Sequence, residues 1–107
     1  MSSSSGAQDG GSEPANDSLV VRVLDIRNTR GLHARASAKF VQTVERYHAE
    51  VRVSRGGETV GGNSIMGLMM LSAGPGTSIK VEASGPQATE VMDALEALVG
   101  GRFGEED

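Results

Sequence analysis

The segment Gly31-Leu32-His33-Ala34-Arg35 places a nucleophilic imidazole two residues before a guanidinium. Turn-forming residues precede it and helix-forming residues follow it, so His33 is expected at a junction between a loop and a helix. The first N–H groups of a helix lack intrahelical acceptors and carry the positive end of its dipole, which favours a bound phosphate. Since histidine can act as a covalent nucleophile, the pattern predicts phosphorylation of His33, with Arg35 balancing the charge of the phosphoryl oxygens. A solvated surface pair is the simpler alternative.

The length of 107 residues and the composition indicate one small domain between two polar ends. Residues 1–17 are mostly Ser, Gly, Asp and Asn, and they form a predicted disordered tail without the apolar core of a signal peptide. Residues 18–100 form the predicted folded domain. Residues 101–107 are rich in glycine and acidic residues, and they are expected to be a solvated acidic tail. No stretch is long and apolar enough to predict a membrane span.

Cysteine content and charge exclude several classes of function. The chain has no cysteine, which excludes disulfides and thiolate metal sites, and its two histidines belong to no cluster with the spacing of metal ligands. We therefore expect neither a metal nor a cofactor. The net charge of −4 argues against a nucleic-acid binder. A cytoplasmic monomer without membrane contact is the expectation.

Hydrophobic periodicity predicts the order β-α-β-β-α-β-α. Strands are expected where apolar residues alternate with polar ones, and helices where apolar residues recur every three or four positions. The expected strands are 19–26, 50–54, a return strand from 59, and 77–84; the expected helices are 34–47, 65–71 and one following Pro86 up to Val99. An α+β fold in two layers follows, a four-stranded antiparallel sheet with three helices on one face.

A second motif, Gly62-Asn63-Ser64-Ile65-Met66-Gly67-Leu68-Met69-Met70-Leu71, follows the first in the chain. Together with the histidine motif and the following Ser37-Ala38-Lys39-Phe40-Val41, it resembles the HPr family, the histidine-containing phosphocarriers of the bacterial phosphoenolpyruvate-dependent phosphotransferase system. The resemblance covers about residues 19–99, and the HPr-like fold is the one predicted above. The form Gly-Leu-His-Ala-Arg-Ala-Ser is similar to the proteobacterial branch associated with nitrogen-type phosphotransfer.

The resemblance implies a role for each matching residue. His33 would accept a phosphoryl group on Nδ1 from enzyme I and pass it to an enzyme IIA protein or domain, with Arg35 stabilising the charge. The protein would be a phosphoryl carrier with a covalent phosphohistidine, rather than a stand-alone enzyme. Ala36 departs from the family, which usually has proline there. Alanine keeps an additional N–H donor beside the site.

The second motif implies regulation and docking. Ser64 matches the serine that HPr kinase/phosphorylase modifies in some bacteria, and it is also the expected N-cap of the short helix. That helix has too few turns to bury all its apolar side chains. We expect a partner-docking surface on it, made of Ile65, Met66, Leu68 and Met69. The alternative is a core position for Ile65, Leu68 and Leu71, which we expect for at least two of the three.

Two other functions remain open at this point. The chain could be a regulatory docking module of the same fold that acts through protein–protein binding, although the presence of His33 argues against it. It could also be an α/β domain in which His33 and Arg35 bind an anion without covalent chemistry. Phosphorylation by enzyme I and phosphoenolpyruvate distinguishes a carrier from both.

Overall fold

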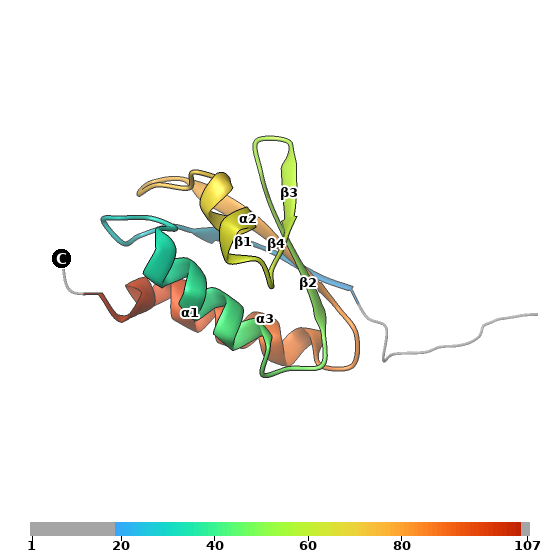
Figure 1. The fold of residues 1–107 in the computed structure, drawn as a ribbon. Helices are drawn as coiled ribbons and strands as arrows, with labels where there is room; N and C mark the ends of the chain where they lie inside the picture. The colour runs from blue at the N-terminus through green and yellow to red at the C-terminus, as the bar shows by residue number, and fades with distance from the viewer. Residues whose placement is uncertain (1–18, 106–107) are drawn as a thin grey trace, which may run out of the picture.

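The computed structural model describes residues 19–105, which form two layers, a sheet and a set of helices (Figure 1). The predicted order of elements is confirmed, with one short 3-10 helix added at the end. The elements are β1 (Leu19–Asp25), α1 (Ala34–Val44), β2 (Glu50–Arg55), β3 (Glu58–Gly61), α2 (Ile65–Met70), β4 (Ser78–Ser84), α3 (Ala88–Gly100) and the 3-10 helix η2 (Arg102–Gly104).

The sheet is antiparallel, with the strand order β1-β4-β2-β3. The last strand in the sequence, β4, therefore lies inside the sheet and pairs with both β1 and β2. Leu24 is paired with Ile79 and Val53 with Val81, so side chains that point to the same face meet across the strands. The turn between β2 and β3 is Gly56-Gly57, where both residues have positive φ values.

The core lies between the sheet and its helices. Inward-facing strand residues and the apolar faces of α1 and α3 are buried, with Phe40, Val81 and Leu95 fully covered. The opposite face of the sheet is open, because alternate residues of β1 such as Val21 and Val23 are exposed. This arrangement confirms the predicted two-layer α+β architecture. No helix within residues 19–105 is long and apolar enough to cross a membrane.

The end of the chain differs from the prediction. The expected acidic tail includes η2, and its Phe103 is only 1 % exposed against the core. Residues 101–105 therefore belong to the folded domain rather than to a solvated tail. Residues 106–107 and the predicted N-terminal tail 1–17 lie outside the described residues.

Candidate functional site

The loop before α1 is fixed by a close approach to the segment that follows α2. The N–H of Leu32 donates to the carbonyl of Ala73 over 2.9 Å, and the Asn28 Nδ2 donates to the carbonyl of Gly31 over 2.9 Å. Gly31 has a φ of +65°, and a Cβ added there would lie 2.2 Å from the Ala73 carbonyl oxygen. Only glycine fits this position without strain, so the loop delivers the next residue to a defined place.

His33 is the N-cap of α1. Its backbone is extended, with φ −77° and ψ −178°, and its carbonyl accepts from the N–H of Ser37 at 2.8 Å. The Nδ1 atom accepts from the backbone N–H of Arg35 at 3.3 Å, a long contact that takes the place of a usual side-chain cap. The lone pair of Nδ1 therefore faces the positive end of the helix. His33 and Arg35 are brought together as the sequence predicted.

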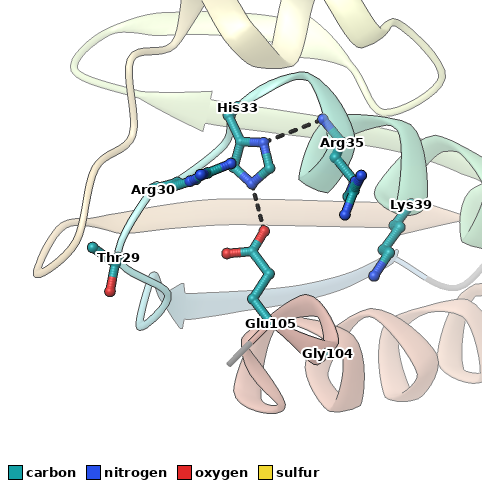
Figure 2. Close-up of a pocket in the computed structure, with 7 residues that line it drawn as sticks. All are labelled: Thr29, Arg30, His33, Arg35, Lys39, Gly104 and Glu105. Atoms are coloured by element: carbon teal, nitrogen blue, oxygen red, sulfur yellow. Dashed lines mark hydrogen bonds and ion pairs between the residues drawn. The ribbon is translucent and has the colours of Figure 1, made fainter. Parts of the chain in front are cut away.

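An open pocket surrounds the imidazole (Figure 2). It gathers three cationic side chains and one carboxylate, and its lining residues are Thr29, Arg30, His33, Arg35, Lys39, Gly104 and Glu105. The first turn of α1 holds no acidic residue, so no neighbouring carboxylate on the helix neutralises Arg35. Because Arg35 itself stands near the positive end of a helix dipole, an incoming anion would relieve that repulsion. The electrostatics of the pocket favour a bound anion.

The C-terminal segment forms one wall of this pocket, which the sequence analysis missed. Figure 2 shows Glu105 below the ring of His33, where its Oε2 contacts the ring Nε2. The other carboxylate oxygen accepts from Asn28 Nδ2 at 3.1 Å, and Lys39 Nζ donates to the Phe103 carbonyl at 2.6 Å. The side chain of Glu105 is 16 % exposed. The one signal available in the sequence was Phe103, the sole large apolar residue of its glycine-rich surroundings.

The turn that brings Glu105 to His33 uses an uncommon backbone conformation. Arg102, Phe103 and Gly104 have φ values of +60°, +56° and +73°. A left-handed conformation costs a residue other than glycine about 1–2 kcal/mol. Two such residues stand here, Arg102 and Phe103, so the cost is about 2–4 kcal/mol. It is offset by burial of the Phe103 side chain, about 1.5–3 kcal/mol, together with the hydrogen bonds that Lys39 and Asn28 donate to the segment. The segment is therefore held against the domain by specific contacts.

Ser64 caps α2, as predicted. Its Oγ accepts from the N–H of Gly67 at 2.9 Å, and a Cβ on Gly67 would lie 3.0 Å from that oxygen. Ser64 is half-buried and does not line the pocket of His33. The His33 loop is instead joined to the residues beyond the C-terminal end of α2, through the carbonyl of Ala73. About one helix length, roughly 9 Å for six residues, therefore separates Ser64 from that junction.

The predicted docking surface on α2 is exposed in part. Ile65 and Met69 are each 39 % exposed, and Met66 is 70 % exposed. Leu68 corrects the expectation, because it is fully buried in the core and no partner can contact it. Met70, 69 % exposed, was missed. We call Ile65, Met66, Met69 and Met70 the α2 surface.

Two residues near the start of α1, Ala36 and Ser37, are buried beside the site. Ala36, which stands where the family usually has proline, is fully buried in the first turn of α1. Ser37 is also buried, and its Oγ donates to the carbonyl of Leu32 at 3.2 Å, which ties α1 back to the loop. Within residues 19–105, no group of three His, Cys, Asp or Glu side chains is placed to hold a metal ion.

Comparisons with known proteins agree with this geometry. A family model described as the PTS HPr component phosphorylation site matches residues 20–100. The phosphocarrier protein HPr of Cupriavidus necator is 48 % identical over 87 residues, which cover 81 % of this chain and 98 % of that protein. The phosphocarrier protein HPr of Neisseria meningitidis is 50 % identical over 87 residues, with the same coverage of both chains.

Solved structures show the same architecture. A crystal structure of HPr from Thermoanaerobacter tengcongensis matches with a TM-score of 0.78 at 36 % identity, covering 82 % of this chain and 99 % of that one. A crystal structure of a phosphocarrier protein HPr from Bacillus anthracis matches with a TM-score of 0.73 at 37 % identity, covering 78 % and 99 %.

Proposed function

Because the chain belongs to the HPr family of phosphocarriers of the phosphotransferase system, we propose that it carries a phosphoryl group on His33 between enzyme I and an enzyme IIA protein or domain. The observation that carries the proposal is the orientation of Nδ1, which faces the N-terminus of α1 with only a long 3.3 Å contact to the Arg35 N–H. The side chain of His33 is 23 % exposed, which supports access of a phosphoryl donor to the ring.

The transfer uses groups that already surround the ring. The lone pair of Nδ1 attacks phosphorus, the bond between phosphorus and the donor breaks, and the donor keeps the bonding electron pair. The N–H of Arg35 is then released from Nδ1 and donates to a phosphoryl oxygen, together with the Arg35 guanidinium. Ala36 keeps an N–H that proline would lack, and the residue has no exposed surface in the unphosphorylated protein. In onward transfer the same donors stay with the phosphoryl group until the acceptor takes it.

Docking and regulation are assigned to α2. The α2 surface is apolar and exposed, and flexible methionine side chains suit contact with more than one partner. Phosphorylation of Ser64 by an HPr kinase/phosphorylase would add negative charge at the start of this helix while leaving it capped. The effect would fall on partner association rather than on the fold.

Incubation with enzyme I and phosphoenolpyruvate tests the function. We expect one phosphoryl group per chain that is labile in acid and stable in base, and transfer of that group to an enzyme IIA protein. His33→Ala should fold normally and take up none. Phosphorylation of His33→Ala would overturn the proposal. So would the absence of phosphorylation in wild type, provided that the same enzyme I phosphorylates a second HPr as a positive control.

A further inference from the structure

The imidazole of His33 is bound at both nitrogens, and only one of those contacts serves the transfer described above. Nδ1 faces the helix, and Nε2 contacts the Oε2 atom of Glu105 (Figure 2). A carboxylate only accepts hydrogen bonds, so Nε2 must carry the proton in this contact. The contact joins residues that are 72 positions apart, and it fixes the ring in the orientation that presents the Nδ1 lone pair.

Glu105 is held there by the rest of the domain. Its second oxygen accepts from Asn28 Nδ2, a side chain with no exposure that also donates to the carbonyl of Gly31. Within the described residues, the Oδ1 of Asn28 is buried without a hydrogen-bond partner. Asn28 therefore donates both Nδ2 hydrogens to the site and leaves its buried Oδ1 without a hydrogen bond. A buried acceptor without a partner costs free energy, and such a cost is expected where a contact serves function. The burial of Phe103 anchors the segment two residues away.

We propose that Glu105 is a positioning residue that accelerates both formation and cleavage of the phosphohistidine bond. When Nδ1 forms its bond to phosphorus and Nε2 keeps its proton, the ring becomes positively charged. The Glu105 carboxylate, bound to that proton, stabilises this charge as it develops. In the reverse direction the ring leaves with the bonding electron pair of Nδ1 and its Nε2 proton, as neutral imidazole. Glu105 holds that proton in place, so the ring does not have to leave as imidazolate.

The inference rests on the proposed function of His33, but its test does not require enzyme I. Wild type, Glu105→Ala and Glu105→Gln are phosphorylated chemically with phosphoramidate, and hydrolysis of the phosphohistidine is followed by ³¹P NMR. Glu105→Ala should slow hydrolysis by about tenfold, the effect of one lost hydrogen bond to a charged group. Glu105→Gln keeps an acceptor and loses the charge, so its rate should lie between the two. Glu58→Ala, the same charge change at the exposed hairpin, should match wild type.

A spectroscopic readout separates positioning from a structural effect. In unphosphorylated wild type, the Nε2 proton should give a downfield ¹H resonance protected from exchange with water. The resonance should persist in Glu58→Ala and vanish in Glu105→Ala, while both variants unfold in urea within about 1 kcal/mol of wild type. With enzyme I, Glu105→Ala should lower kcat and leave KM within about twofold, since the α2 surface is untouched.

Distinct results would overturn each proposal. Equal hydrolysis rates in wild type and Glu105→Ala, or a Nε2 proton resonance that survives the substitution, would refute the role of Glu105. A lower rate carried wholly by KM would assign Glu105 to docking and would also refute it. Failure of enzyme I to label wild type, with the chemical hydrolysis still dependent on Glu105, would refute the proposed carrier function and leave the role of Glu105 standing.

Discussion

Replacement of Phe103 by alanine tests whether the C-terminal segment belongs to the functional domain. Phe103 is 1 % exposed and belongs to the core cluster, yet it lies in η2 at the end of the described chain. A buried Phe→Ala substitution costs about 3–5 kcal/mol when the surrounding structure keeps the cavity. The segment can instead detach here, because no later element holds it within the described residues.

Detachment sets the magnitude of the effect. When the segment detaches, the free energy of unfolding falls by the contribution of one buried phenylalanine side chain, about 2–3 kcal/mol. This value is at the low end of the range for core substitutions. Relief of the left-handed conformation at Arg102 and Phe103 is offset by the loss of the hydrogen bonds that Lys39 and Asn28 donate to the segment. Against a total stability of about 5–15 kcal/mol, the domain remains folded. The melting temperature should fall by roughly 10–20 °C, from about 4–8 °C per kcal/mol for a domain of this size.

Urea unfolding and the NMR signal of the His33 ring measure the two consequences together. Phe103→Ala should lower stability by the stated amount and also abolish the protected Nε2 proton, because Glu105 leaves with the segment. When Glu105→Ala is added to Phe103→Ala, the double variant should show the same Nε2 proton signal and the same phosphohistidine hydrolysis rate as Phe103→Ala alone. Phe103→Leu, which keeps apolar bulk, should cost less than about 1.5 kcal/mol and retain the signal. A change in stability below about 0.5 kcal/mol for Phe103→Ala, with the signal intact, would refute the docking of this segment.

Four further substitutions address the loop, the charge partner and α2. Gly31→Ala should destabilise the domain by at least about 3 kcal/mol in urea, because the new methyl group meets the Ala73 carbonyl in a left-handed backbone, and a near-neutral result would contradict the loop geometry. Arg35→Ala should still be phosphorylated on His33 but should transfer to enzyme IIA more slowly, as rapid-quench kinetics would show; an unchanged transfer rate would make Arg35 a bystander. Ser64→Asp should keep its stability within about 0.5 kcal/mol, since aspartate also caps helices, and should lower the initial rate of phosphorylation by enzyme I, most at low salt. A rate equal to wild type at low salt would reject electrostatic regulation from this position, about a Debye length from the loop junction. Met66→Glu should weaken binding to enzyme I in calorimetry while changing stability by less than about 0.5 kcal/mol, and a large fall in melting temperature with unchanged affinity would place Met66 in the core.

The elements and the His33–Arg35 pair could be predicted because their signals are local. Alternation in β4 and the spacing of Phe40 and Val44 in α1 reflect one buried face, which a short window of sequence reveals. The loop before His33 was predicted as a turn from its residue types. Helix ends were less certain, and α1 ends at Val44 rather than at Tyr47.

The remaining features depend on contacts between distant parts of the chain. The α2 helix is apolar on every side, so its sequence could not tell which residue faces inward, and Leu68 was assigned to the surface although the fold buries it. Gly100-Gly101 indicates the end of a helix. It does not show whether the residues that follow form a free tail or pack back against the domain. Phe103 and Glu105 gain their positions from α1 and the Asn28 loop, and no local pattern encodes that return.

The central position of β4 in the sheet has a consequence for how the domain forms as it is synthesised. Only β2 and β3 can pair as a local hairpin, whereas β1 has no neighbour until β4 emerges after most of the domain. An incomplete chain therefore exposes unpaired edges of β1 and β2, which are open to pairing with other chains, and β1 also exposes Val21 and Val23. Folding must wait for non-local contacts, so its rate is governed by loop closure more than by helix formation. The pocket of His33 is completed later still, when residues 102–105 follow α3, so a chain that has not yet reached these residues lacks the complete site.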